Sequence, residues 1–336
     1  MKVMTPHYYK DFRCIAGACT DTCCAGWDVD VDKDSYKYYK TVKGAFGKRL
    51  KSVMVPSQDG ECTFTLQEGG RCPFLNDDNL CDLYIELGED KLCETCAEFP
   101  RFINDYGNIR EIGIAPSCKT AGELMFSYKD ELTFDTVEDN SLTLEPNDID
   151  AYTYMHLRQA RIVAFGIISD RDISIFERLM LYLDYAKRIQ KHLDAEKDEL
   201  IAGVAKRFCG ADYREELLDK LKSRDEKLHG KRLIKGLRHF FDDFKGMEVI
   251  NPDWNIHVAR VRQFLDGLAD DSGLAAVMKT YHAGSEAFAH EYEQLAMYYV
   301  YRYMLDAVND YDILLKAKNA VIGILAVDIM AAANQA

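Results

Sequence analysis

The chain has 336 residues, of which 48% are hydrophobic and 29% are charged, a composition typical of a globular protein. This length predicts two domains, or one domain with a small satellite. The formal net charge is −14, which would repel a polyanion unless charge is strongly segregated, so nucleic acid is excluded as an expected partner. A cationic target, such as a lysine side chain, would be attracted.

No targeting segment is expected at the start of the chain. Residues 1–14 contain one early lysine but no apolar segment followed by a small-residue cleavage site. The most apolar stretch, Ala317 to Ala333, includes Lys318, Asn319 and Asp328 and is too short and too polar to span a bilayer. We therefore expect a buried terminal helix there, no membrane association and a cytoplasmic protein.

Residues 1–125 are rich in cysteine, glycine and turn signals, and they predict a cysteine-rich metal module. Strict alternation of aspartate and valine over 28–32 predicts a short strand, followed by a helix near 35–53. Gly60 and the pair Gly69-Gly70 predict turns around a short hairpin. Regular structure is otherwise sparse in this region, so its loops need another source of cohesion.

Residues 126–146 are polar and acidic and predict a connector, and residues 147–336 predict an α-helical domain. Apolar residues recur at helical spacing over 149–168 and 173–193. Tyrosines point in all directions around a helix at 292–305, so we expect other helices to surround it. Further helices are expected near 196–208, 212–222, 231–244, 254–269, 274–282, 284–309 and 311–333. The predicted fold class is mainly α, with an irregular cysteine-rich metal-binding N-terminal module packed on a C-terminal α-helical domain.

The cysteines carry the chemical prediction. Ten of the eleven fall between Cys14 and Cys118. A reducing cytosol disfavours a disulfide framework, and clustered free thiols would be open to oxidation, so metal ligation is the remaining explanation. Soft thiolates select zinc, Cu(I) or iron–sulfur. The predicted ligands are Cys14, Cys19, Cys23, Cys24, Cys72, Cys81, Cys93, Cys96 and Cys118.

The identity of the metal and the number of centres stay open. Zinc sites use four ligands, commonly as two short pairs, and only Cys93-x2-Cys96 and Cys19-x3-Cys23 have that shape. Nine ligands also exceed the needs of one zinc ion. Cys62 has no partner within a short turn, and its role is left open. Cys209 lies on a predicted helix and is expected to be an ordinary buried thiol, apart from the others.

The run Cys14-x4-Cys19-x3-Cys23-Cys24, followed by Gly26-Trp27, resembles the flagellin lysine-N-methylase family. The cysteine module alone also resembles a wider superfamily described as zinc- or iron-chelating. Two segments outside the module are similar to the narrower family, so the resemblance covers most of the chain. All the segments that carry it besides the first run are Arg71–Leu75, Cys81, Glu86–Glu89, Cys93-x2-Cys96 with Phe99-Pro100-Arg101, Ser117-Cys118, Ile173–Leu179 and Glu293–Leu305.

This resemblance implies a protein-lysine N-methyltransferase that uses S-adenosylmethionine to methylate lysine side chains of flagellin. It also implies an iron–sulfur cluster of the 4Fe–4S type held by the N-terminal cysteines, with zinc as the alternative. The catalytic residues and the S-adenosylmethionine site are unassigned, because no Gly-x-Gly-x-x-Gly follows a strand. Glu98 and Tyr84 are candidate site residues, against a capping or core role.

Two other functions remain open on the sequence alone. The chain would then be an iron–sulfur or zinc protein without methyltransferase activity, acting either in electron transfer or as an interaction scaffold. The large helical domain favours the enzyme, because a small electron carrier does not need such an appendage.

Overall fold

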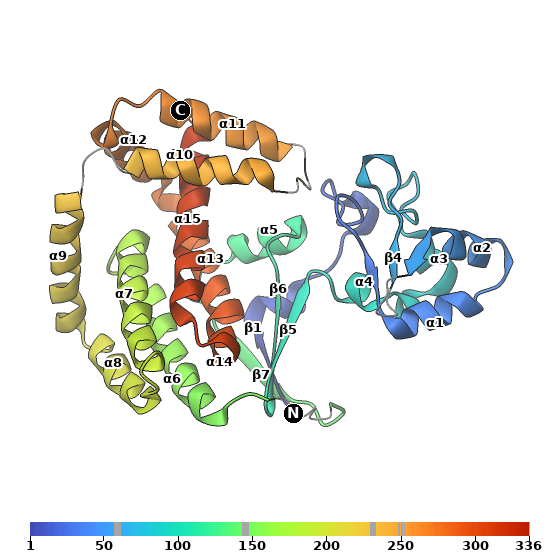
Figure 1. The fold of residues 1–336 in the computed structure, drawn as a ribbon, viewed down its shortest axis with the longest axis horizontal. Helices are drawn as coiled ribbons and strands as arrows, with labels where there is room; N and C mark the ends of the chain where they lie inside the picture. The colour runs from blue at the N-terminus through green and yellow to red at the C-terminus, as the bar shows by residue number, and fades with distance from the viewer. Residues whose placement is uncertain are drawn as a thin grey trace.

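A computed structural model describes residues 1–56, 62–142, 148–228, 233–247, 249, 251 and 253–335. The molecule is mainly helical and elongated (Figure 1). The helices of the C-terminal half lie at one end, the cysteine-rich residues lie at the other, and a four-stranded sheet stands between them. Within these residues, every helix is too short or too polar to cross a membrane.

The helices predicted after residue 147 are all present. The segment expected as one helix over 284–309 is divided into α13, a 3₁₀ turn (Met304–Asp306) and the short α14. A 3₁₀ turn (Asp198–Leu200) also precedes α8. The helices are α6 (Ala151–Ile168), α7 (Ile175–Leu193), α8 (Ile201–Phe208), α9 (Ala211–Leu228), α10 (Leu233–Asp243), α11 (Asp253–Asp266), α12 (Asp271–Ser285), α13 (Ala289–Tyr303), α14 (Ala307–Asp310) and α15 (Ile313–Gln335).

Helix α7 shows how local sequence sets a boundary. The Ser174 side chain accepts a hydrogen bond from the Glu177 backbone N–H, and the Glu177 carboxylate accepts one from the Ser174 backbone N–H, which completes a capping box. The apolar residues that follow at helical spacing, including Leu179, Tyr182 and Ile189, are buried. The predicted helix over 173–193 is therefore confirmed.

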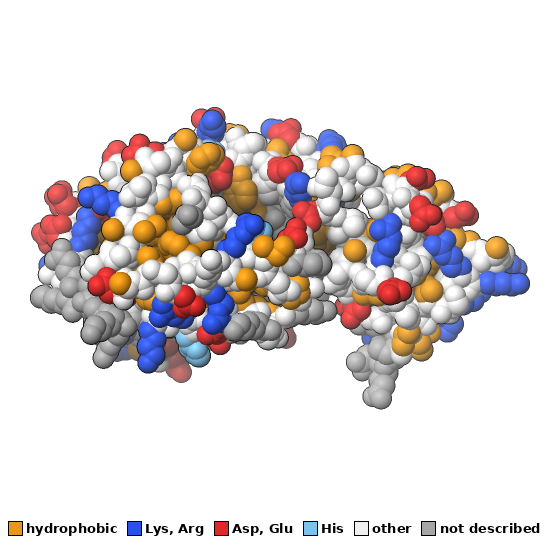
Figure 2. All heavy atoms as spheres, turned by 90° about the horizontal axis from the view of Figure 1, so that it is seen from above, with side chains coloured by type: hydrophobic (Ala, Val, Ile, Leu, Met, Phe, Trp, Pro, Cys, Tyr) orange, Lys and Arg blue, Asp and Glu red, His pale blue; other side chains and the backbone are white. Residues whose placement is uncertain are grey.

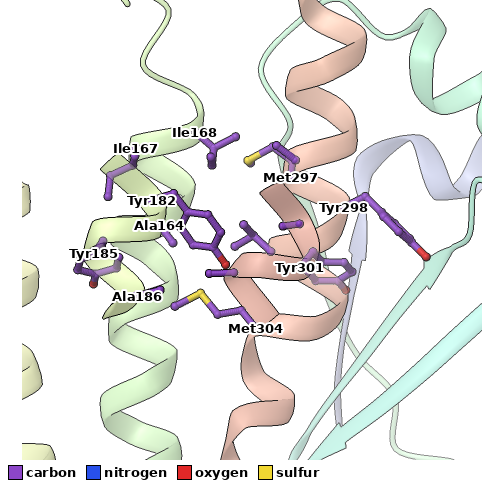
Figure 3. Close-up of a cluster of buried hydrophobic side chains, with 14 of the residues drawn as sticks. Ala164, Ile167, Ile168, Tyr182, Tyr185, Ala186, Met297, Tyr298, Tyr301 and Met304 are labelled. Atoms are coloured by element: carbon purple, nitrogen blue, oxygen red, sulfur yellow. The ribbon is translucent and has the colours of Figure 1, made fainter. Parts of the chain in front are cut away.

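The main core lies where α6 and α7 face α13 (Figure 3). Ala164 and Ile168 come from α6, Tyr182 comes from α7, and Met297 and Tyr301 meet them from α13. Both tyrosines are almost fully buried, at 1% and 2% exposure. This confirms that other elements surround the tyrosine-rich helix.

Helix α15 corresponds to the terminal helix predicted from the sequence, but only one of its faces is buried. Ala317 and Ile324 are enclosed, whereas Ile322 and Val327 remain 43% and 46% exposed. The expectation of a buried helix therefore holds for the face that packs on α7 and α13.

The central sheet has the strand order β5-β6-β1-β7. β5 and β6 form an antiparallel hairpin, β1 runs parallel to β6, and β7 pairs antiparallel with β1. β7 lies inside the segment predicted as a connector. The strands are β1 (Lys2–Pro6), β5 (Arg101–Tyr106), β6 (Ile109–Ile114) and β7 (Phe134–Glu138).

Residues on both sides of the cysteine-rich segment share the helical core. Tyr8 and Phe12 after β1, Phe102 in β5 and Met125 in α5 (Lys119–Ser127) belong to the same buried cluster as α6, α7 and α13. The structure thus joins the sheet to the helices through packing. The division at 125 and 146 stays a prediction.

The cysteine-rich segment has a core of its own, built from Val31, Tyr39, Leu50, Phe64 and Phe74. Its small antiparallel sheet has the order β2-β4-β3. The elements are β2 (Asp30–Val31), α1 (Lys33–Thr41), α2 (Gly44–Val53), β3 (Met54–Pro56), β4 (Cys62–Phe64), α3 (Asp82–Leu87) and α4 (Glu94–Glu98), with 3₁₀ turns at Ala16–Ala18, Glu68–Gly70 and Glu89–Lys91. Further 3₁₀ turns elsewhere in the chain are His7–Asp11, Phe244–Gly246 and Glu286–Phe288.

The single helix expected over 35–53 is wrong, because Val42 and Lys43 have extended backbones and separate α1 from α2. The expected strand over 28–32 is present but shorter, since Asp32 caps α1 with a bond from the Ser35 backbone. β3 and β4 form the expected hairpin. Its turn at Gly60 lies outside the described residues, and Gly69 and Gly70 form a 3₁₀ turn with positive φ.

Figure 2 shows one face of the molecule, on which acidic and basic side chains are interspersed with hydrophobic ones. Charge is not segregated into a single-sign patch over the described residues of this face. The surface there offers no basic track of the kind that binds nucleic acid.

Candidate metal centre

Six of the predicted ligands line one pocket in the cysteine-rich segment: Cys23, Cys24, Cys72, Cys81, Cys93 and Cys96. The pocket is partly open to solvent. Its other walls are mainly apolar and include Trp27, Phe64, Phe74 and Phe99. Thiols from four separate segments of the chain therefore converge on one largely apolar cavity.

Backbone pairing brings the first two segments together. The Cys72 amide donates to the Cys24 carbonyl at 2.9 Å, and Gly26 donates to Gly70, also at 2.9 Å. The backbone of Gly70 has a φ of +72°, in the left-handed region. Glycine is favoured there because it tolerates the positive φ.

The remaining thiols are placed by α2, α3 and α4. Arg49 of α2 bonds to Asp82 Oδ2 at 2.6 Å and to the Pro73 carbonyl at 2.5 Å, which fixes the loop between Cys72 and Cys81. Cys81 is the N-cap residue of α3. Cys93 caps α4, and Cys96 follows three residues later on the same helical face, so one turn presents both thiols to the cavity.

The thiols also shift one another's pKa through hydrogen bonds and charge. A hydrogen bond from Cys23 lowers the pKa of the Cys24 thiol to about 7, with Thr22 and Arg71 acting in the same direction against burial. Bonding to Cys96 likewise lowers the pKa of Cys93. Burial raises the pKa of Cys72 to about 11. A bound cation would replace the protons of such buried thiols.

Two hydrogen bonds hold the loop that carries Cys14, Cys19 and Cys23. Lys119 at the start of α5 donates to Thr20 at 2.6 Å, and Asn251 donates to Asp21 at 3.1 Å. These two bonds tie the loop to the sheet and helices.

The other three predicted ligands lie outside the pocket lining. Cys14 and Cys118 are close enough that their charges raise the pKa of Cys23, after its bond to Cys24 and burial. Cys19 donates a weak hydrogen bond to the Asp21 carbonyl at 3.3 Å, and the described residues show no contact between it and another cysteine. The set of nine ligands therefore remains a prediction.

The two cysteines left out of that set are also placed. Cys62 is buried in β4 at 1% exposure and does not line the pocket. Cys209 lies apart at the C-terminal end of α8, as expected, but it is exposed rather than buried. The apolar face of α8 turns Phe208 into the core, so the next residue points away from it.

The cysteines that line the pocket are of the type that binds soft metal groups. Within the described residues, no three cysteine, histidine or carboxylate side chains converge closely enough to hold one metal ion. A zinc ion needs four donors at about 2.3 Å, whereas a cubane cluster spreads its thiolate ligands around a larger core. The six thiols are enough in number for either group.

Glu98 and Tyr84 do not line this pocket. Glu98 is half-buried at the end of α4, where burial and Glu94 raise the pKa of its carboxyl, and Tyr84 is 48% exposed on α3. The sequence interpretation did not assign Trp27 and Phe99 to the site. Their rings lie 5.6 Å apart, and the Trp27 indole donates to the Cys23 carbonyl. Trp27 and Phe99 stand in the segments Gly26-Trp27 and Phe99-Pro100-Arg101 that carry the family resemblance, and this is the signal that could have identified them.

The fold and the pocket define a mainly helical protein that carries a thiol-lined module at one end. Residues 161–336 match the family model described as the FliB lysine N-methylase C-terminal domain. Because this match covers just over half of the chain, the protein belongs to the FliB lysine N-methylase family. The resemblance seen in the sequence is therefore confirmed.

Three curated relatives are similar over 122 residues, or 34% of this chain. The flagellar biosynthetic protein FliU of Salmonella muenchen is 31% identical, and 72% of its length is covered. The lysine-N-methylases of Salmonella choleraesuis (strain SC-B67) and Salmonella typhimurium (strain LT2) are each 30% identical, but only 30% of their length is covered. No solved structure matches the chain.

Proposed function

We propose that this protein is an S-adenosylmethionine-dependent lysine N-methyltransferase that acts on flagellin in the cytoplasm, with an iron–sulfur cluster held in the thiol-lined pocket. Membership of the FliB lysine N-methylase family carries the proposal. Two of the similar proteins are named lysine-N-methylases and a third is named as a flagellar biosynthetic protein, which supports a lysine on a flagellar protein as the substrate.

The chemistry of the transfer sets requirements for the protein. A lysine ammonium must first lose a proton, and the neutral amine then attacks the methyl carbon of the sulfonium while the carbon–sulfur bond breaks. The amine, methyl carbon and sulfur must lie in line, so both reactants must be held. The net charge of −14 favours the approach of a cationic lysine.

The pocket fits the proposed cluster through its own side chains. Four of the lining residues Cys23, Cys24, Cys72, Cys81, Cys93 and Cys96 would provide its thiolate ligands. The cluster would supply a Lewis-acidic, redox-active centre there. The aromatic walls would limit the access of solvent to such a group.

The test is methylation of cognate flagellin by protein reconstituted without oxygen. Protein, flagellin and S-adenosylmethionine are incubated, and lysine-bearing peptides are searched for mass increases of one methylene per transfer. Iron-free protein and Cys209→Ser protein serve as controls, since Cys209 lies outside the pocket.

Methylation that needs iron supports the whole proposal. Equal methylation without iron keeps the enzyme and removes the cluster from its chemistry. The absence of methylation in protein with an intact cluster would instead favour a metal-binding module without transferase activity. That second function is compatible with a pocket built entirely inside the separate core of the module.

A further inference from the structure

Four ionisable side chains form two hydrogen-bonded pairs among the helices that match the family model, away from the cysteine pocket. Tyr281 and His282 come from α12, Tyr292 comes from α13 and Asp328 comes from α15. Their separation in the sequence means that only the packing of the three helices assembles them. This network places the deeply buried Asp328 carboxylate near Tyr281 and His282, whose side chains reach the surface.

His282 is held in one orientation. Its Nε2 lies 3.0 Å from both carboxylate oxygens of Asp328. Phe176 of α7 stacks against the imidazole with ring centroids 4.6 Å apart and planes 28° apart. A carboxylate at Nε2 favours the tautomer with its proton on that nitrogen, which leaves Nδ1 as a lone-pair acceptor. Within the described residues, the structure shows no hydrogen bond at Nδ1.

The other arm of the network supports the carboxylate. The Tyr292 hydroxyl lies 3.0 Å from that of Tyr281, and it is close enough to Asp328 for the two groups to affect each other's pKa. The Asp328 side chain is only 3% exposed, whereas the His282 side chain is 35% exposed. Burial raises the pKa of the Asp328 carboxyl, partly offset by His282 and Tyr292. A partly exposed imidazole thus lies against a buried carboxylate.

The charged groups around His282 leave it as the accessible base of the network. Phe176 is followed by Glu177 and Arg178, which are already paired with Lys222 and Glu293. On the other helices the groups that meet the imidazole are the members of the network itself.

We propose that His282 is the general base for the methyl transfer and that the neighbouring rings of Phe176 and Tyr281 receive the substrate ammonium. This inference rests on the proposed function. An N–H proton of the lysine ammonium passes to Nδ1 of His282, and the positive imidazolium is paired with Asp328. The freed amine lone pair forms the N–C bond to the methyl group of the sulfonium donor. The C–S electron pair stays on sulfur, which leaves as a neutral thioether.

The first test compares His282→Gln with His290→Gln. His290 is also half-buried, but its Nε2 meets the backbone carbonyl of Phe126, so it controls for the loss of a histidine near the same helices. The methyl-transfer kcat of His282→Gln should fall by about 10²–10⁴-fold, the usual contribution of a general base. Its pH–rate profile should lose the acid limb seen in wild type. His290→Gln should keep both, and thermal unfolding checks that each variant is folded.

The second test needs no activity. Histidine Cε1–H resonances are followed by NMR while n-butylamine and Nα-acetyl-lysine amide are added to the full-length protein. Saturable shifts at His282 that disappear in Asp328→Asn support an amine site at this network. Shifts that are equal in the variant, or no shift at all, overturn it.

The two proposals fail in different ways. If wild-type protein methylates flagellin and His282→Gln retains its kcat and its pH profile, the base assignment is wrong and the proposed function stands. If wild-type protein does not methylate flagellin, the proposed function is wrong, and the amine titration alone decides whether His282 marks an ammonium site.

Discussion

Arg161 of α6 and Glu111 of β6 form a bidentate ion pair in which the two side chains are only 3% and 1% exposed. One of its bonds, from Nη1 to Oε2, measures 2.7 Å, and the same nitrogen also donates to the Tyr301 carbonyl at 3.1 Å. The pair therefore ties the central sheet to α6 and α13. Because both side chains are buried, water cannot solvate the charge that remains when one partner is removed.

Glu111→Gln should destabilise the protein by about 3–5 kcal/mol, because it leaves the Arg161 charge buried without compensation. Urea unfolding measures the loss. Replacing both partners, as in Glu111→Leu with Arg161→Met, should recover much of it, since no charge is then left buried. Lys220 and Glu216 form an exposed pair, so Glu216→Gln should cost less than about 1 kcal/mol. Equal losses in Glu111→Gln and Glu216→Gln would show that the buried pair is not a structural tie.

Cys23→Ser with Cys24→Ser should lose bound metal and expose the cysteine-rich segment to proteases. Its small core rests on few apolar side chains, so ligation would supply folding free energy directly. Metal content is measured by elemental analysis, and limited proteolysis should concentrate cleavage before about residue 125. Cys209→Ser is the matched control because Cys209 is exposed on the helical side. Unchanged metal content and protease resistance in the double variant would contradict a structural centre at this pocket.

Glu177 should give a stability contribution that is lost in acid. Burial opposes its ionisation, but hydrogen bonds from Lys222 and Ser174 outweigh burial and lower the pKa of the carboxyl below its ordinary value of 4.5. A lowered folded-state pKa means that the contribution is fully present above 4.5 and disappears as the pH falls through the folded value. Glutamine can still serve a capping box, so Glu177→Gln removes mainly the charge.

The wild type should therefore be more stable than Glu177→Gln at pH 7, and the difference should vanish at low pH. Denaturant unfolding at a series of pH values measures it. A difference that stays constant down to acid pH would mean that packing, and not ionisation, explains the effect of this residue.

Two glycines should respond to alanine in opposite directions. Gly113 in β6 pairs with Phe102, and a Cβ there would overlap the phenylalanine ring, so Gly113→Ala should cost about 1–3 kcal/mol. Gly166 lies in α6, where a Cβ would meet nothing within 4 Å. Gly166→Ala should therefore stabilise the protein by about 0.5–1 kcal/mol. Thermal unfolding of the two variants gives the sign of each change.

The sequence predicted what local patterns determine. Ser174 and Glu177 carry the start of α7 within four residues, and the spacing of Leu179, Tyr182 and Ile189 carries its buried face. The central sheet was not predicted, because the parallel pairing of Lys2 with Ile109 leaves no local trace. The hairpin of β5 and β6 did leave one, the tight turn at Gly107 between two alternating segments.

The site residues also divide into those that local sequence predicted and those that only packing brings together. Close sequence pairs such as Cys93 and Cys96 predicted thiols on one face, and the structure places both in the pocket. His282 and Asp328 had no such signal, since each stands alone on its own helix and only the packing of α12 against α15 brings them together. A contact between residues on two separate helices cannot be predicted from residue spacing in the sequence.

The position of β1 between β6 and β7 has a consequence for synthesis on the ribosome. β1 is translated before both of its partners, which follow only after the whole cysteine-rich segment. Until then its backbone groups have no partners in the sheet, while the enclosed core of the cysteine-rich segment depends only on residues already made. Nascent chains should therefore acquire the thiol-lined pocket, and any metal it takes, before the first strand finds its place.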